Sequence, residues 1–264
     1  MLRFYVEVAR TAFRRQLIYR WANLAGLLTN IFWGVIMSYV IIALFHARPL
    51  AAGYNVQDTL RYTWLVQAMI MVVLEFRRDD LMLTIRSGEV VTDLSKPCDF
   101  YWYWFSRGVG RAAYYVLYRC LPTYTAGMLL FGIGLPGGWN TWFLYAVSLL
   151  FGTALGIAYS FLYNIIAFWV LEARAVSGLA TTIALFFTGS YVPLIFFPPW
   201  LHTIVGWLPF NGLMNVPAEI FLGKLSGSSL LFELGRQVLW LIVLTLVVRL
   251  LTSLAVRRVT IQGG

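Results

Sequence analysis

The chain has 264 residues, of which 60% are hydrophobic and only 12% are charged. Soluble domains average about 25% charged residues, so this composition excludes a typical soluble protein and predicts an integral membrane protein. The net charge of +9 is expected of a membrane protein with basic inner loops and does not require nucleic acid as a partner. Six helical spans of roughly 20 residues would leave only polar segments shorter than the roughly 50 residues of a minimal domain. We therefore expect residues 1–264 to form a single transmembrane domain with no soluble catalytic domain.

The chain begins with an amphipathic segment, residues 1–23. Val6, Ala9 and Phe13 recur at helical spacing. Arg10 falls on the opposite face of such a helix. We predict an interfacial helix that lies along the inner membrane surface and contacts anionic lipid headgroups. A plain anchor for the first span is the alternative. No cleaved signal peptide is expected.

Six apolar runs are candidates for transmembrane helices, which predicts an all-α integral membrane protein. The runs are residues 24–45, 59–75, 112–135, 142–171, 176–197 and 230–254. When the loops are assigned to alternate sides, nearly all their basic residues fall on one side, and only Arg48 and Lys224 fall on the other. This bias predicts that both termini are cytoplasmic.

The connection between the second and third runs, residues 77–111, is the longest and most charged of the predicted inner loops. Asp79 and Asp80 are suited to the first turn of a short helix. That helix should break near Gly88, and the segment should stop at Pro97. We predict a rigid cytoplasmic element that can dock on a partner protein, with a solvated connector as the alternative.

The segment before the last run, residues 198–229, is apolar but interrupted by prolines, which excludes one continuous helix. Its apolar content excludes a solvated loop. We predict a re-entrant hairpin of two short helices in the outer leaflet, acting either as an outer gate or as a structural lid. The candidate gate residues are Pro193, Phe197, Pro198, Pro199 and Trp200.

Four groups of motifs are similar to one family of proteins. They are Arg86-Ser87-Gly88-Glu89 with Asp93-Leu94-Ser95-Lys96-Pro97, Phe168-Trp169-Val170-Leu171-Glu172-Ala173-Arg174, Val192-Pro193-Leu194 with Phe197-Pro198-Pro199-Trp200-Leu201, and Leu208-Pro209-Phe210 with Val216-Pro217-Ala218-Glu219. In order and spacing they resemble the six-span permeases of ATP-binding-cassette (ABC) exporters of the ABC-2 type, in a bacterial branch of that family.

The resemblance implies a multi-pass protein of the bacterial cytoplasmic membrane. Two cytoplasmic ABC ATPase subunits would be its partners, together with membrane lipid and a second permease, which is either the same chain or a related six-span chain. Coupling to the ATPases would use the second-to-third connection and a second inner loop. The expected coupling residues are Asp79, Asp80, Leu81, Ile85, Arg86, Ser87, Gly88, Glu89, Glu172 and Arg174.

The chain carries no G-x-x-x-x-G-K-[ST] run, so ATP and Mg²⁺ are expected on the partner ATPase and not on this chain. His46 and His202 lie far apart in the sequence, and we expect no metal site, no bound cofactor and no catalytic residue. This chain is therefore not predicted to be an enzyme itself.

The acids nearest the predicted spans are Glu75, Glu172 and Glu233, and all three lie at span ends. Ion-coupled transporters usually place carboxylates near the bilayer midplane. We therefore predict ATP-driven export of a hydrophobic or amphipathic substrate from the cytoplasm or inner leaflet. An ion-coupled secondary transporter or channel is the alternative.

Two further features lie within the spans. Arg119 lies inside the third span, where it either snorkels to the inner surface or lines a substrate pathway. Gly152 and Gly156 form a G-x-x-x-G spacing in the fourth span, which is typical of close helix packing.

Overall fold

The structure, a computed structural model, describes residues 2–47, 53–74, 79–170 and 173–257, and most of these residues are helical. No β-strand occurs in these ranges, which confirms the predicted all-α class. The α-helices in chain order are α1 (Leu2–Ile18), α2 (Arg20–Ala47), α3 (Val56–Val73), α4 (Asp80–Arg86), α5 (Val90–Leu94), α6 (Phe100–Tyr115), α7 (Leu121–Phe131), α8 (Trp139–Ile165), α9 (Ala173–Phe187), α10 (Pro199–Trp207), α11 (Val216–Phe221) and α12 (Gly227–Val256).

Four short turns of other helix types complete these elements. A π-helical turn, Val116–Cys120, joins α6 to α7 in one continuous rod, and a second, Asn211–Asn215, leads directly into α11. The 3₁₀ turns Ile166–Phe168 and Leu194–Phe196 follow α8 and precede α10.

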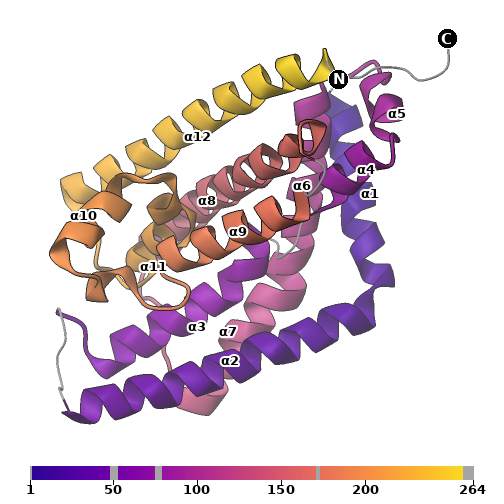
Figure 1. Cartoon of the computed structure of the whole chain (residues 1–264). Coiled ribbons are helices and arrows are strands. Elements are labelled where there is room, and N and C mark those ends of the chain that lie inside the picture. The colour runs from indigo at the N-terminus through magenta and orange to yellow at the C-terminus, as the bar shows by residue number, and fades with distance from the viewer. Residues whose placement is uncertain (1, 48–52, 75–78, 171–172, 258–264) are drawn as a thin grey trace.

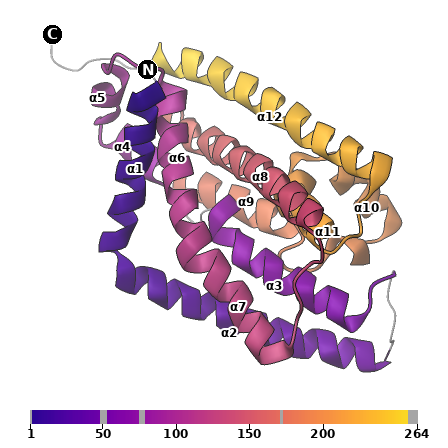
Figure 2. The same ribbon diagram turned by 180° about the vertical axis from the view of Figure 1, so that it is seen from behind.

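The helices form an elongated bundle with two distinct ends (Figures 1 and 2). At one end, here called the α1 end, lie α1, α4, α5 and the last described turns of α12. At the opposite end, the α10 end, lie α10, α11, the end of α2 and the start of α3. The predicted coupling segment and the predicted gate therefore lie at opposite ends of the bundle.

Three described helices are long and apolar enough to cross a membrane: Arg20–His46, Trp139–Phe168 and Gly227–Val256. They correspond to the first, fourth and sixth predicted spans. The fifth, α9, is apolar but shorter. By length and composition the structure thus confirms three of the six predicted spans.

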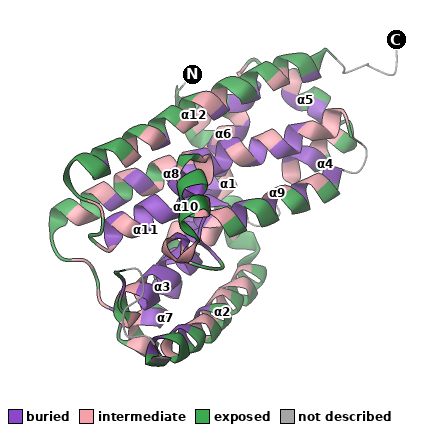
Figure 3. Ribbon diagram, turned by 60° about the vertical axis from the view of Figure 1, so that its left-hand side comes forward, coloured by how far each residue is buried: buried purple, intermediate pink, exposed green. Residues whose placement is uncertain are grey.

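Helix α3 and the α6–α7 rod are not among the helices that are long and apolar enough to cross a membrane, and the structure shows a physical reason for each. Helix α3 is buried along most of its length (Figure 3), and it places the polar side chains of Thr63 and Gln67 inside the bundle. The α6–α7 rod carries Arg107 and Arg111 near its first end and a π-helical turn in its middle. Since neighbouring helices cover these polar groups, neither helix needs a uniformly apolar surface.

The outer faces of α2 and α12 are exposed and strongly apolar (Figure 3). Phe32 on α2 is 62% exposed, and Leu246 on α12 is also 62% exposed. Exposed apolar stripes of this length are unfavourable in water and suit contact with lipid or with another transmembrane protein.

Several predicted boundaries are wrong. The predicted loop 77–111 is shorter, because α6 begins at Phe100, where the Asp99 side chain accepts a hydrogen bond from the Trp102 amide at 3.0 Å. The fifth predicted span ends at Phe187 instead of 197. Gly189 then turns the chain with φ +82° beneath the Tyr62 hydroxyl group, a conformation that only glycine adopts readily.

Gly152 and Gly156 lie where other elements approach α8 most closely. A methyl group at Gly156 would meet the backbone carbonyl of Val73 on α3, and one at Gly152 would meet that of Leu213. The predicted role of this glycine pair in close helix packing is confirmed.

Candidate functional site

The segment formed by α4 and α5 projects from the α1 end, and three hydrogen-bonded contacts fix α4 to the bundle. The Ser177 hydroxyl group of α9 donates to Asp79 Oδ1 at 2.7 Å. The Met82 amide donates to Asn164 Oδ1, at the end of α8, at 3.1 Å. Leu81 is 3% exposed and belongs to an apolar cluster beneath the segment. Helices α8 and α9 therefore hold α4 from two sides.

The third contact is an ion pair with α6. Arg111 Nη1 lies 2.5 Å from Asp80 Oδ2, and Arg107 Nη2 lies 3.9 Å from the same oxygen. Burial alone would raise the pKa of Asp80, but the guanidinium groups of Arg111 and Arg107 outweigh it and hold that pKa below its usual 3.8. Asp80 is therefore ionised at neutral pH and connects α4 to α6.

Helix α5 is fixed to α6 by a separate contact. Lys96 Nζ donates to Asp93 Oδ1 at 2.6 Å and to the Tyr103 hydroxyl group at 3.0 Å. Between α4 and α5, Gly88 adopts φ +79° and makes the predicted break. The two short helices therefore have separate anchors on either side of one glycine turn.

One edge of the segment faces away from the bundle. This exposed edge, here called the α4–α5 rim, consists of Leu83, Arg86, Ser87, Gly88, Glu89, Val91 and Thr92. Leu83 is 44% exposed and Val91 is 40% exposed. The rim therefore combines two apolar side chains with one positive and one negative charge on a rigid support, a composition that suits docking to a protein surface.

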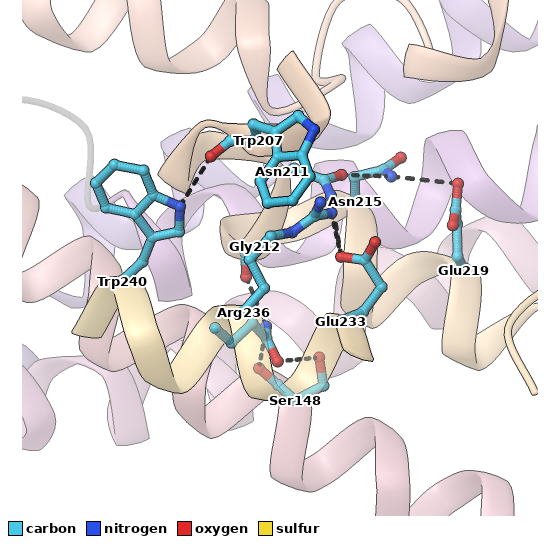
Figure 4. Close-up of polar contacts among 10 residues, drawn as sticks. Ser148, Trp207, Asn211, Gly212, Asn215, Glu219, Glu233, Arg236 and Trp240 are labelled. Atoms are coloured by element: carbon cyan, nitrogen blue, oxygen red, sulfur yellow. Dashed lines mark hydrogen bonds and ion pairs between the residues drawn. The ribbon is translucent and has the colours of Figure 1, made fainter. Parts of the chain in front are cut away.

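The α10 end holds a buried polar network that the sequence analysis did not identify (Figure 4). The Tyr62 hydroxyl group of α3 donates to Asn215 Oδ1 at 2.7 Å. Asn215 Nδ2 donates to Asn211 Oδ1 at 2.9 Å and to Glu219 Oε1 at 3.2 Å. Asn211 in turn donates to Glu233 Oε2 at 3.3 Å. The i, i+4, i+8 spacing of Asn211, Asn215 and Glu219 is the sequence signal for this network.

Helix α12 completes the network (Figure 4). Arg236 forms an ion pair with Glu233, three residues earlier on the same helix. The Gln237 side chain donates to the carbonyl of Gly212 at 2.7 Å and to that of Ser148 on α8 at 3.1 Å. Three elements, α8, α12 and the π turn before α11, are therefore joined through one buried amide.

A cavity of about 560 Å³ opens beside this network. Its lining includes Tyr54, His202, Glu219, Lys224, Glu233 and Arg236. Charged side chains of both signs therefore line the cavity beside apolar ones such as Leu194 and Trp207.

Comparison with known protein families identifies the family of this chain. The sequence model described as "ABC-2 family transporter protein" matches residues 31–263, which is most of the chain. The chain belongs to the ABC-2 transporter family. It is therefore an ABC transporter permease, the membrane component of such a transporter and not its ATPase. No curated protein matches the chain.

The structure divides the expected coupling residues of this ABC-2 permease into two groups. Arg86, Ser87, Gly88 and Glu89 lie on the exposed rim. The internal group comprises Asp79, Asp80, Leu81 and the half-buried Ile85, which face the bundle. Arg174 is exposed at the start of α9, and Glu172 lies outside the described residues. Sequence spacing alone could not separate the two groups.

The candidate gate residues surround the start of α10. Phe197 packs on Phe186 of α9 with ring centroids 5.3 Å apart. Pro198 and Pro199 are exposed, and Pro199 begins α10, as expected for proline in a first helical turn. Trp200 is 65% exposed. The stretch before α12 contains the short helices α10 and α11, and the re-entrant hairpin and its position relative to the membrane stay predictions.

Arg119 joins the α6–α7 rod to α2. Its Nη1 donates to the Asn23 carbonyl at 3.0 Å, and its Nη2 donates to Asn30 Oδ1 at 3.3 Å. Gly26 leaves the space that the guanidinium group occupies. The side chain therefore makes an interhelical contact, and a role in the substrate pathway stays a prediction.

Proposed function

We propose that this ABC-2 permease is the transmembrane subunit of an ATP-driven exporter. It would have six spans and cytoplasmic termini, pair with itself or with a related permease, and work with separate ATPase subunits that bind ATP and Mg²⁺. The observation that carries the proposal is the α4–α5 rim, an exposed edge on a segment that is anchored to α6, α8 and α9. Family membership supports this reading over the ion-coupled alternative.

The mechanism that we propose is mechanical. Closure of the ATPase subunits displaces the rim, and the anchors of α4 carry that displacement to α6, α8 and α9 at once. A switch between two access states requires a bias of several kcal/mol, roughly 5.5 kcal/mol for a complete change of population. A flexible loop would absorb that bias, whereas a segment held by Ser177, Arg111 and Asn164 passes it on.

The proposed substrate is hydrophobic or amphipathic and moves outward. The exposed faces of α2 and α12 are apolar, while the cavity at the α10 end includes charged side chains of both signs in its lining. An amphipathic molecule fits both surfaces, because its apolar part can follow the bundle while its polar part enters the cavity.

Affinity purification of the tagged chain from its native membrane, followed by mass spectrometry, tests the assignment of partners. We expect an ATPase with Walker motifs in roughly equal amount to the permease. Recovery of the chain alone under several mild detergents, with substrate flux in proteoliposomes that follows an ion gradient and ignores ATP, would exclude the proposal.

A charge swap on the rim tests the site of coupling. In R86E/E89R the two rim charges exchange places while the net charge stays constant. We expect at least a tenfold loss of substrate-stimulated ATPase activity, because charges placed opposite like charges at an interface cost several kcal/mol. The matched control is R86K/E89D, which changes the same two exposed positions but keeps each charge in its place. Full coupling in R86E/E89R would exclude the rim as the docking edge.

A further inference from the structure

A second cavity, of about 710 Å³, lies at the α1 end between α1, α6 and the start of α4. Small-molecule sites occupy about 300–1,000 Å³, so this volume is sufficient for a lipid headgroup. Its lining includes Val8 and Arg15 from α1, Tyr19 from the turn after α1, and Tyr103, Arg107 and Arg111 from α6. We call it the α1–α6 cavity.

The cavity arises from how α1 and α6 cross. At Gly110 a methyl group would meet the backbone of Ala9, so the two helices touch there at the level of their backbones. On α6, Tyr103, Arg107 and Arg111 recur every four residues and share one face. These large side chains border the space that opens beside the close crossing.

Positive charge dominates this space. Arg15, Arg107 and Arg111 line it together with the acids Glu7 and Asp80. Asp80 pairs closely with Arg111, at 2.5 Å, and lies 3.9 Å from Arg107. Among the described lining residues, three guanidinium groups thus face two carboxylates, and Asp80 is shared between two of the arginines.

Arg107 is the group best placed for a ligand. Its guanidinium carbon lies 4.1 Å from the centre of the Trp104 ring, which fixes its position without using its N–H donors. Within the described residues its charged partner is Asp80, beyond hydrogen-bond distance. Its side chain is 19% exposed, so it is enclosed but accessible. A guanidinium group in this state is suited to a phosphate, which it can bind with two parallel hydrogen bonds.

The surroundings indicate a lipid as the source of that phosphate. Helix α1 contains no buried residue, and it exposes Leu2 by 79%, Ile18 by 77% and Val6 by 55%. Trp21, at the start of α2, is 72% exposed. An amphipathic helix of this kind lies in the headgroup region of a membrane, and its apolar residues would contact the acyl chains of a lipid whose headgroup enters the cavity.

We infer that the α1–α6 cavity binds the headgroup of an anionic glycerophospholipid from the cytoplasmic leaflet, with its phosphate on Arg107 and Arg15. The inference rests on the proposed function only for the cytoplasmic position of the α1 end. Because Asp80 shares Arg107 and Arg111 with this site, a bound phosphate competes with Asp80 for the same donors. Occupancy of the cavity thereby changes how firmly α4 is held.

Lipid titrations followed by native mass spectrometry of the full-length chain in a delipidating detergent test this inference. The probes are phosphatidylglycerol and phosphatidylcholine with identical acyl chains. We expect phosphatidylglycerol to bind about tenfold more tightly, because the choline ammonium group would face the arginines. R107Q and R15Q should each weaken phosphatidylglycerol binding by about tenfold, the effect of losing one charge-assisted hydrogen bond.

Two further variants separate a specific site from general charge or misfolding. R14Q removes one exposed charge from the same helix, outside the cavity, and should change the affinity less than about twofold. D80N removes the competing carboxylate and should tighten phosphatidylglycerol binding, a change that misfolding would not produce.

Equal weakening in R14Q and R107Q, or unchanged binding in R107Q and R15Q, would overturn the inference. Displacement of the lipid by an equimolar amount of glycerol 1-phosphate would show that the cavity takes a soluble phosphate and would overturn the assignment to a lipid. None of these measurements requires an ATPase, so their failure is distinguishable from failure of the proposed function.

Discussion

Replacement of Asp80 by asparagine tests how α4 is held to the bundle. The substitution keeps the size of the side chain but removes the charge that pairs with Arg111 at 2.5 Å and attracts Arg107 at 3.9 Å. The contacts of Asp79 with Ser177 and of the Met82 amide with α8 are left in place. We therefore expect α4 to loosen locally while the bundle stays folded.

The magnitude follows from the burial of the pair. Removing one partner of a fully buried ion pair costs about 3–5 kcal/mol, whereas an exposed pair contributes about 0–1 kcal/mol. The Arg111 side chain is 7% exposed and that of Asp80 is 43% exposed. We therefore expect D80N to lower the free energy that holds α4 against the bundle by an intermediate amount, about 1–2 kcal/mol. It corresponds to a roughly 5–30-fold increase in the opening of α4.

Hydrogen–deuterium exchange of the purified protein measures this opening directly. In D80N the amides of α4 should exchange about 5–30-fold faster, while the thermal midpoint of the bundle changes little. The matched control is D93N, which removes the partner of Lys96 on α5 and should act on α5 alone. Unchanged exchange of α4 in D80N would refute the argument that the ion pair anchors α4.

Three further predictions concern other parts of the molecule. Gly156→Val should cost about 1–3 kcal/mol by forcing α8 from a backbone carbonyl of α3, lowering the thermal midpoint, whereas Gly178→Ala, with open space around it, should not. Tyr62→Phe should cost about 0.5–1.5 kcal/mol by removing the bond to Asn215, and an unchanged midpoint would contradict this. Because the pKa of Asp80 is lowered, the stabilisation that its carboxylate gives to α4 is fully present above pH 3.8. It is lost only as the pH falls through the lowered pKa. Exchange at α4, corrected for intrinsic rates, should therefore stay constant from about pH 8 to about pH 5.

Much of the fold was predictable because local patterns specify it. The amphipathic helix α1, the break at Gly88 and the close packing at Gly156 each follow from residue type and spacing. The two short helices before the last span follow from the positions of the prolines. Each of these features depends on residues that are neighbours in the sequence.

The features that could not be predicted depend on distant residues. Asp80 faces inward because Arg111 lies on a helix 31 residues later, and a helix as short as α4 gives no periodic pattern that reveals its buried side. The bond from Tyr62 to Asn215 spans 153 positions. The burial of the polar side chains Thr63 and Gln67 of α3 likewise depends on helices that are distant in the sequence.

Helix α8 contacts both α4 at the α1 end and the polar network beside α10. The distance along this helix therefore sets how far apart the two contacts lie. Asn164 in its last turn holds the α4 backbone, and Ser148, about a third of the way along the helix, contacts Gln237 of α12 in the polar network. At 1.5 Å per residue these two side chains are about 24 Å apart along one helix. If α8 moves as a rigid body, a displacement of its end at α4 produces a displacement of similar size at the network beside α10. Communication between the two ends therefore requires no chain of side-chain rearrangements, because one rigid element is present at both.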